Sequence, residues 1–412
     1  MRSVEIFSGA GGLAKGLEIS GFEHVAFVEF NNDACASLRM NFGPQLVFQG
    51  DIRHFDFSQI SDVDIVAGGP PCQPFSLGGK HKASDDARDM FPYAIHAIEQ
   101  LKPKAFIFEN VKGLLRPSFA DYFEYVIARL RYPDIAISAD DDWQAHLNIL
   151  RSIKHTTFQD VKYDVSYKLI NAANYGVPQT RERVVIVGIR SDLGVKWTFP
   201  KPTHFEDRLI WEQSISGEYW QRHGIADQEI LPRGEAVRKR MDRVQNSYGV
   251  FAPEGLPWRT VRDTLADVPD PQSSHSIIDH IFKGGARSYP GHTGSEFDWP
   301  SKTLKAGGHG VPGGENMIRF QDGSIRYLTV YEAKLLQTFP KDFVVTGPWG
   351  EAMRQIGNAV PVLLGEIMGR RLYSLISGET DVLSSDTSLV GEPKTLWPEW
   401  AEKKRRYAEL GR

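Results

Sequence analysis

Short apolar runs recur along the first half of the chain, and most of them end at a glycine or an acidic side chain. Runs of this length that are rich in β-branched residues predict buried strands, and strands alternating with helical spacing are typical of an α/β fold. Loops at the carboxyl ends of such strands carry the chemistry of α/β enzymes. The seven runs are residues 4–7, 25–28, 46–48, 63–67, 105–108, 163–169 and 184–189.

The most constrained loop is residues 68–76, with the sequence GGPPCQPFS, directly after the fourth run. Two consecutive prolines fix φ and favour extended geometry before each of them, so Cys72 cannot join a helix. We therefore predict that Cys72 is a nucleophile on a stiff loop at a strand end. The alternative is burial as a small apolar side chain. That role suits Cys35, which lies in an amphipathic helical pattern at 32–38.

A glycine turn follows the first run, where Gly9, Gly11 and Ala14 fit the pattern G-x-G-x-x-G/A. Small residues let a ligand approach the backbone and the free N–H groups of the next helix. Glu29 ends the second run 20 residues after Gly9, the spacing of a ribose-binding carboxylate. Asp51 follows the third run, so Glu29 and Asp51 lie at successive strand ends. Two carboxylates suit the hydroxyls and the amine of a ligand better than they suit a phosphate. The pattern favours a nucleoside cofactor without pyrophosphate; a ligand-free turn and a helix N-cap at Asp51 are alternatives.

Further charged residues are predicted near the same edge of the sheet. Glu109 ends the fifth run, as Cys72 follows the fourth, and a helix cap is its alternative role. Arg181 and Arg183 occupy alternate positions in QTRER at 179–183, so an extended segment would point both side chains the same way. A surface strand of ion pairs is the alternative for this segment.

The composition narrows the class of protein. With 412 residues, 41% hydrophobic and 24% charged, the chain has the make-up of a soluble globular protein of two or three domains. Its two cysteines form no disulfide framework and its histidines lack ligand spacing, so we expect no metal and a reducing cytosol. We expect neither a leader nor a membrane span. The net charge of −4 means that nucleic-acid binding would depend on local basic groups.

Together these motifs resemble those of C5-cytosine DNA methyltransferases of the compact bacterial modification type. The resemblance implies an α/β, class I S-adenosylmethionine-dependent methyltransferase (Rossmann-like) catalytic domain, with a smaller, loop-rich target-recognition domain. The motifs keep the family's order between residues 4 and 361. The matching stretches are FSGAGG at 7–12, PPCQ at 70–73, ENV at 109–111, QTRER at 179–183, RYLT at 326–329 with QTFP at 337–340, and QIGNAVP at 355–361.

The resemblance implies that a cytosine is flipped out of double-stranded DNA and that Cys72 adds to C6. Glu109 would hold N3 and the 4-amino group, favouring protonation at N3, while Arg183 would bind O2. Arg181 would help to fix and acidify the thiol region. C5 then takes the methyl group of S-adenosylmethionine, and loss of the C5 proton releases Cys72.

The resemblance also implies a pocket for S-adenosylmethionine at the carboxyl ends of the strands. The implied contacts are Phe7 stacked on the adenine, Gly9, Gly11 and Gly12 beside the methionine part, Glu29 on the ribose, Asp51 and Ile52 at the adenine, and Ser8, Pro70, Asn358 and Ala359 completing the pocket.

Residues 191–325 lie outside the matching motifs, where the family keeps its variable target-recognition domain. This stretch has few long helical periods and many Gly, Pro, His and Trp residues. We predict that its loop 303–316 reads the bases, because its glycines allow close approach. The expected base contacts there are Lys305, His309, Glu315 and Asn316, and a flexible surface loop is the alternative. Thr303 with Leu304 resembles a Thr-Leu pair that the family keeps near the backbone of the flipped nucleotide. The predicted division is 1–190 catalytic and cofactor-binding, 191–325 target recognition, 326–385 returning to the catalytic domain, and 386–412 a polar, basic tail.

Two other segments offer DNA contacts. Residues 76–86 are polar and glycine-hinged, which predicts a lid that closes over the target with Ser76 and Lys80 on the DNA. The stretch 233–243 is predicted to be a basic helical patch that follows phosphates, and a solvated helix face is its alternative.

The expected enzyme is a monomer of the bacterial cytosol, associated with the nucleoid and paired with a restriction endonuclease. A tRNA cytosine-5 methyltransferase is the nearest alternative, but that subfamily has a Cys-Phe-Thr tripeptide in its target domain and no cysteine follows Cys72 here. A catalytically inactive DNA-binding regulator would not need Cys72 together with Glu109 and Arg183. A Rossmann oxidoreductase leaves the Pro-Pro-Cys loop unexplained.

Overall fold

A computed structural model describes residues 1–71, 89–138, 142–154, 160–226, 235–290, 292–306, 316–320 and 322–378. Several predicted features therefore lie outside the described residues. They are Cys72, Ser76, Lys80 and the predicted lid at 76–86, His309 and Glu315, and the tail at 386–412.

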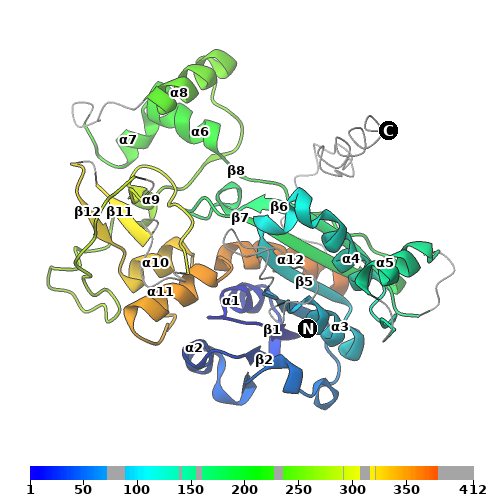
Figure 1. The fold of residues 1–412 in the computed structure, drawn as a ribbon. Coiled ribbons are helices and arrows are strands. Elements are labelled where there is room, and N and C mark those ends of the chain that lie inside the picture. Colours follow the sequence, from blue (N-terminus) through cyan, green and yellow to red (C-terminus); the bar gives the residue numbers. More distant parts are fainter. Residues whose placement is uncertain are drawn as a thin grey trace.

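A seven-stranded sheet forms the centre of the larger part of the molecule (Figure 1). Its strands are β1 (Arg2–Ile6), β2 (Glu23–Glu29), β3 (Val47–Gln49), β4 (Ile65–Gly68), β5 (Ala105–Val111), β6 (Tyr163–Asn171) and β7 (Glu182–Arg190). The order is β3-β2-β1-β4-β5-β7-β6, and the first five strands are parallel. β7 runs antiparallel to both β5 and β6. All seven predicted runs are strands, and the α/β prediction is confirmed.

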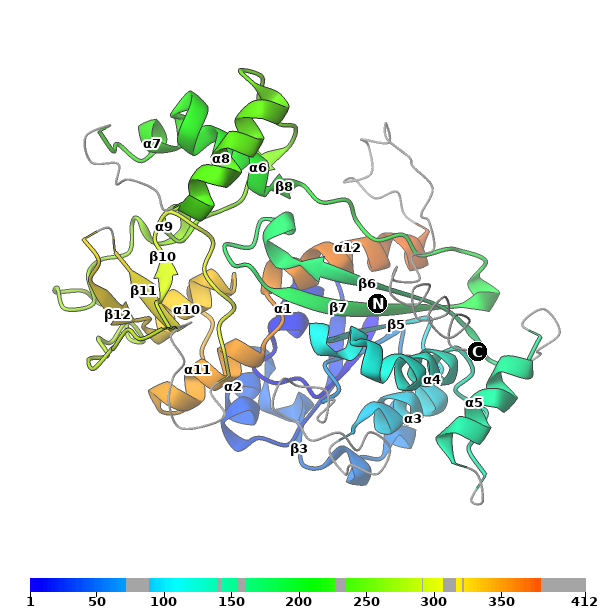
Figure 2. The ribbon, with the colours of Figure 1, turned by 45° about the horizontal axis from the view of Figure 1, so that its top comes forward.

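Helices cover both faces of this sheet (Figure 2). They are α1 (Gly12–Ile19), α2 (Asn32–Phe42), α3 (Phe91–Leu101), α4 (Ala120–Arg131), α5 (Trp143–Ser152) and α12 (Val362–Ser377). The alternation of side chains along β4 shows how the faces are divided. Val66 packs with α3 and α4, whereas Ile65 and Ala67 pack with α1 and α12. Cys35 is fully buried in α2, which confirms its predicted packing role.

The second part of the molecule carries two small sheets and a group of helices. Its elements are β8 (His204–Phe205), α6 (Glu206–Trp211), α7 (Glu218–Arg222), α8 (Glu235–Tyr248), β9 (Leu256–Pro257), α9 (Val261–Leu265), β10 (Ser295–Glu296), β11 (Met317–Arg319) and β12 (Ile325–Tyr327). Helix α8 has 14 residues and covers most of the stretch 233–243 that was predicted to be helical. Only a narrow apolar seam that includes Val244 packs against Trp211, and charged residues dominate the rest of the helix.

The chain then returns to the large sheet through α10 (Val330–Leu336), α11 (Trp349–Asn358) and α12. Thr329 and Glu332 form a capping box that starts α10, as the spacing T-x-x-E favours. Ser37 of α2 donates a hydrogen bond to Gln355 of α11 at 2.7 Å, so segments far apart in sequence lie side by side (Figure 1). Within the described residues, no helix combines the length and the apolar character needed to cross a membrane.

Candidate active site and cofactor pocket

The chain that leads to Cys72 is held firmly at the carboxyl ends of β4 and β5. Asn110 Nδ2 donates a hydrogen bond to the carbonyl of Pro70 at 3.0 Å, and the N–H of Met90 donates to the carbonyl of Pro71 at 3.0 Å. These bonds fix the last two described residues before Cys72. The predicted stiff loop is therefore anchored at its start, beside the strand that carries Glu109.

Glu109 and Arg183 form a buried ion pair across β5 and β7. Arg183 Nε lies 2.7 Å from Glu109 Oε1, and the side chains are 14% and 11% exposed. The contact is an ion pair and not an aligned hydrogen bond, because Oε1 has no partner that meets hydrogen-bond geometry. A Cβ on Gly69 would lie 3.7 Å from Glu109 Oε2, so the carboxylate reaches the end of β4. Glu109 lies within a strand, so the alternative role of a helix cap is excluded.

Arg181 lies close enough to this pair for their charges to interact, but its guanidinium bonds elsewhere. It is 1% exposed, and its Nη1 donates to the carbonyl of Gly357 at 2.9 Å. Burial, followed by the positive charge of Arg183, lowers the pKa of Arg181 well below its ordinary value. Arg181 Nε has no hydrogen-bond partner among the described residues. The alternative of a surface strand of ion pairs is wrong for Arg181, because the side chain is buried.

The glycine turn and Glu29 meet as their 20-residue spacing predicted. Gly9 N–H donates to Glu29 Oε2 at 2.7 Å. The other oxygen, Oε1, accepts from the N–H groups of Phe30 at 2.9 Å and Asn31 at 2.8 Å. The Ser8 hydroxyl donates to the carbonyl of Glu5 at 2.8 Å. The Glu29 carboxylate thus braces the turn, and contact with a ribose would add to these bonds.

The backbone of this turn is left-handed at two positions and open at Gly9. Phe7 has φ = 53°, a left-handed conformation that costs a non-glycine residue about 1–3 kcal/mol and is concentrated at functional sites. Gly9 has φ = 54°, and a Cβ there would meet no atom within 4 Å. Phe30 is 73% exposed directly after Glu29 and offers a further aromatic face.

Asp51 takes the N-cap role that was its alternative prediction. Its carboxylate accepts from Arg53 N–H at 2.9 Å at the start of the short 3₁₀ turn Ile52–His54, and it forms an ion pair with the Arg53 guanidinium. Hydrogen bonds from Arg53 lower the pKa of Asp51 to about 2, so the side chain is ionised at neutral pH. The N-cap leaves room for a second acceptor role, because a carboxylate has about four lone-pair sites.

Gly12 is surrounded by the returning C-terminal segment. A Cβ at Gly12 would lie 2.2 Å from the carbonyl oxygen of Val360 and 3.0 Å from the Cβ of Ala359. The missing side chain therefore allows α1 to pack against the segment that includes Asn358. Contact of Gly12 with the cofactor stays a prediction.

A buried carboxyl group beneath the turn was missed by the sequence reasoning. Glu5 of β1 is 1% exposed, and burial raises its pKa to about 8. Its Oε2 has no hydrogen-bond partner among the described residues. An acid inside an apolar strand run was the available signal. The described residues contain no group of three or more His, Cys, Asp and Glu side chains placed to hold a metal ion.

The predicted DNA-reading segment is partly described, and one of its expected contacts is wrong. Thr303 Oγ1 donates to the carbonyl of Thr180 at 2.7 Å, and Lys305 is exposed. Asn316 is only 2% exposed, and its amide bonds to both the N–H and the carbonyl of Lys305 at 3.1 Å. Asn316 therefore braces the loop instead of presenting its amide to a base.

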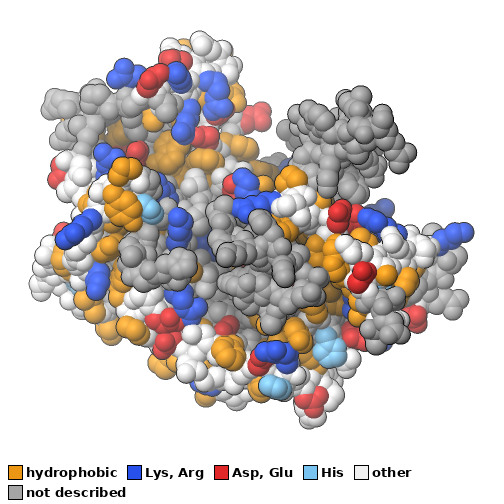
Figure 3. Space-filling model, viewed as in Figure 1, with side chains coloured by type: hydrophobic (Ala, Val, Ile, Leu, Met, Phe, Trp, Pro, Cys, Tyr) orange, Lys and Arg blue, Asp and Glu red, His pale blue; other side chains and the backbone are white. Residues whose placement is uncertain are grey.

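The predicted basic patch is largely neutralised where it is described. Lys239, Arg240 and Arg243 of α8 pair with Glu235, Glu206 and Asp207 respectively. Figure 3 shows basic and acidic side chains interspersed over this region at the top of the view. These pairs favour the alternative of a solvated helix face.

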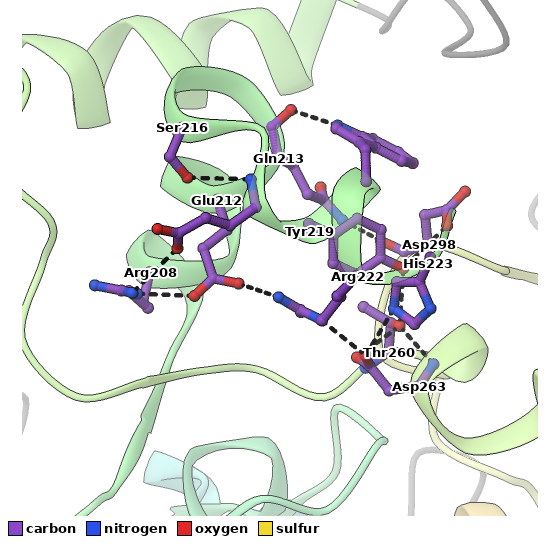
Figure 4. A network of polar contacts seen from close by, with 12 residues as sticks. Arg208, Glu212, Gln213, Ser216, Tyr219, Arg222, His223, Thr260, Asp263 and Asp298 are labelled. Atoms are coloured by element: carbon purple, nitrogen blue, oxygen red, sulfur yellow. Dashed lines mark hydrogen bonds and ion pairs between the residues drawn. The ribbon is translucent and has the colours of Figure 1, made fainter. Parts of the chain in front are cut away.

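A buried polar network braces the helices of this second part (Figure 4). Glu212, 3% exposed, pairs with Arg208 and Arg222, and Arg222 also pairs with Asp263 at the start of α9. The Tyr219 hydroxyl donates to Asp298 Oδ1 at 2.9 Å. The network joins α6 and α7 to α9 and to the loop before β11.

Two solved structures share the fold. A mutant of DNMT2 from Spodoptera frugiperda aligns with a TM-score of 0.54 and 16% identity, covering 90% of this chain and 99% of that chain. The methyltransferase EhMeth of Entamoeba histolytica aligns with a TM-score of 0.53 and 15% identity, covering 91% and 98%. At these identities the likeness concerns the fold alone. The fold is that of a class I S-adenosylmethionine-dependent methyltransferase, as predicted.

Sequence relatives are more specific. The type II methyltransferase M.PspPI of a Psychrobacter species is 32% identical over 91% of this chain and 79% of that protein. The type II methyltransferase M.NgoMIV of Neisseria gonorrhoeae is 30% identical over 92% of this chain and 98% of that protein. The family model for C-5 cytosine-specific DNA methylases matches residues 1–134 and 144–374. With the motifs and the sheet that carries them, these matches show that the chain belongs to the C-5 cytosine-specific DNA methylase family.

Proposed function

We propose that this DNA methyltransferase modifies C5 of a cytosine flipped out of double-stranded DNA, through a covalent adduct of Cys72 at C6. The observation that carries the proposal is the buried pair of Glu109 and Arg183, set beside the anchored Pro70 and Pro71 that lead to Cys72. An acid on β5 and the cation on β7 that pairs with it match the polar groups of a cytosine ring, which presents N3 with an amine on one side and a carbonyl on the other.

In this mechanism the Cys72 thiolate forms a bond to C6, and the ring electrons move to C5. Glu109 accepts a hydrogen bond from the 4-amino group, and in its protonated form it would transfer its proton to N3 as negative charge develops there. That proton would return to Glu109 when the adduct breaks down. Arg183 holds O2, while its pairing with Glu109 fixes both side chains before the base arrives. Arg181 lies within electrostatic reach of both, and it would help to position the thiol region through its buried guanidinium.

S-adenosylmethionine, when bound, would supply an electrophilic methyl group. C5 would donate its electron pair to the methyl carbon, and the S–CH3 bond would break to leave S-adenosylhomocysteine. A base removes the C5 proton, and the C6 bond to Cys72 breaks to give 5-methylcytosine and free thiolate. The open space at Gly9, the strained Phe7 and the acids Glu29 and Asp51 fit a cofactor with adenine, ribose and an amino-acid end. These residues would bind and orient it against the flipped base.

The relatives are named type II methyltransferases, and we extend that role to host protection beside a paired restriction endonuclease. We also retain residues 191–325 as the proposed target-recognition domain, with Thr303 and Lys305 on the DNA. The enzyme would act as a cytosolic monomer. Flipping costs a few kcal/mol, which contacts in the pocket offset.

The test follows tritium from labelled S-adenosylmethionine into duplex DNA, with tRNA as a competing substrate. Wild type should label DNA, and the variant Cys72→Ala should label nothing while still binding DNA. DNA with 5-fluorocytosine should trap the wild type covalently, because fluorine cannot leave C5 as a proton does. Turnover by Cys72→Ala, or labelling of tRNA alone, would refute the proposal. Bisulfite sequencing of the labelled DNA then identifies the target sequence.

A further inference from the structure

Three segments that are distant in sequence meet behind the candidate active site. They are residues 178–181, residues 301–306 and residues 356–359. Ser301 N–H donates to the carbonyl of Pro178 at 2.9 Å, and Thr180 N–H donates to the carbonyl of Ser301 at 2.8 Å. The proposed DNA-contacting segment is thus bonded directly to the segment that carries Arg181.

Two buried glutamines connect all three segments. Gln179 and Gln337 are both 0% exposed. Leu304 N–H donates to Gln179 Oε1 at 3.2 Å, and Gln179 Nε2 donates to Gln337 Oε1 at 3.0 Å. Gln337 Nε2 then donates to the carbonyls of Ile356 at 2.7 Å and Ala359 at 3.1 Å. We call this chain of bonds the glutamine relay.

The side-chain amides of Gln179 and Gln337 can satisfy these hydrogen bonds in one orientation only. Leu304 offers a donor at one end and Ile356 offers an acceptor at the other, so both amides must point their oxygens toward Leu304. A buried amide that loses its partner costs about 1–3 kcal/mol. Neither glutamine can therefore rotate without breaking bonds to one of the segments.

The same segments are also in tight backbone contact. A Cβ at Gly357 would lie 2.7 Å from Lys305 C and 2.7 Å from Ala306 N. Arg181 also donates to the carbonyl of Gly357. A displacement of residues 304–306 must therefore be transmitted to residues 356–359, where the proposed cofactor contacts Asn358 and Ala359 begin.

We propose that Gln179 and Gln337 are positioning residues that couple DNA binding to cofactor binding. The inference rests on the proposed function, because it needs DNA at Thr303–Lys305 and the cofactor at Asn358–Ala359. A target seated on residues 303–305 holds Leu304 N–H in place, and the relay passes this constraint to the carbonyls of Ile356 and Ala359. Coupling of this kind is reciprocal, so the cofactor must tighten DNA binding by the same factor.

The test measures the DNA dissociation constant with and without S-adenosylhomocysteine, in the full chain. We call the dissociation constant without S-adenosylhomocysteine, divided by that with it, the coupling ratio. It should be roughly 5 or more in wild type, within the usual range of coupling. In Gln179→Met, a variant of similar volume without hydrogen bonds, the ratio should fall toward one. Each ligand alone should bind with nearly unchanged affinity. kcat should fall by about 10²-fold, as misplacement of about 1 Å produces, with little change in KM.

Asn41→Leu is the matched control. The Asn41 amide also bridges two segments, since Nδ2 donates to Ser37 and Val344 carbonyls and Oδ1 accepts from Val344 N–H. This variant should lose stability but keep the coupling ratio. If Gln179→Met fails to fold, Gln179→Asn, which keeps an amide too short to span the relay, should show the same loss of coupling.

Two outcomes overturn the inference. One is a coupling ratio of one in wild type. The other is a folded Gln179→Met or Gln179→Asn that keeps the wild-type ratio and kcat. Either would leave the proposed function standing, because that function depends on label transfer and on Cys72. A wild type that transfers no label to DNA would instead refute the proposed function itself.

Discussion

Substitution of Gly12 by alanine tests whether this glycine is needed for packing of the chain, independently of any contact with the cofactor. An alanine Cβ at this position would lie 2.2 Å from the carbonyl oxygen of Val360, whereas ordinary contact begins at 3.4 Å. The oxygen belongs to the backbone, so no side-chain rotation relieves the overlap. Either α1 or the segment that carries Ala359 must move by about 1 Å, a shift that close-packed interiors resist.

The magnitude follows from two opposed effects. Overpacking of this kind costs about 1–3 kcal/mol, and a clash with a rigid backbone atom belongs near the upper end. Alanine regains at most about 1 kcal/mol of helix propensity at the start of α1. We therefore expect Gly12→Ala to lower the free energy of unfolding by about 2 kcal/mol in the absence of any ligand.

The assay is urea denaturation of the cofactor-free protein, followed by circular dichroism, with an unchanged m-value as the check on two-state unfolding. Gly9→Ala is the matched control, because its Cβ enters open space. Alanine in the left-handed conformation of Gly9 costs about 1–2 kcal/mol of stability. The lower conformational entropy of the unfolded variant offsets about 0.4–1 kcal/mol of this cost. Gly9→Ala should chiefly weaken cofactor binding. If the free energy of unfolding of cofactor-free Gly12→Ala lies within about 0.5 kcal/mol of the wild-type value, the packing role is refuted.

Two further predictions concern buried and capping acids. Burial raises the pKa of Glu5 to about 8 from its ordinary 4.5, so its contribution to stability is full below about pH 4.5 and is lost as the pH rises through about 8. Glu5→Gln should flatten this fall in unfolding free energy between about pH 5 and about pH 9, and an unaltered profile would count against the assignment. Asp51→Ala should weaken cofactor binding measured by calorimetry and leave DNA affinity nearly unchanged. Arg53→Met, which keeps the Asp51 carboxylate, is its control, and equal cofactor affinity in wild type and Asp51→Ala would contradict the prediction.

Local patterns determined much of this protein. Each apolar run could be recognised as a strand because short runs of β-branched residues fit a buried, pleated surface, although the hydrogen bonds of each strand come from neighbouring strands of the sheet. The spacing of Gly9 and Glu29 was equally informative, since a strand-turn-helix-strand unit has a nearly fixed length. The sequence alone therefore placed the sheet, the glycine turn and the carboxyl edge with Glu109.

Tertiary packing decided what several of these residues touch. Gly12 was expected to face a ligand, and the structure sets it against Val360, a neighbour 348 residues away. Asn316 was expected on the surface and lies buried against Lys305. A residue type states which bonds it can make, but the partner depends on which segment the fold brings alongside.

The glutamine relay is the clearest case of this division. QTRER marked Gln179 as part of a motif, but nothing near it in sequence points to Leu304 or Gln337. Those bonds span 125 and 158 positions. They form only because a buried amide must find a donor and an acceptor, and the returning chain supplies both once the sheet and its covering helices have assembled.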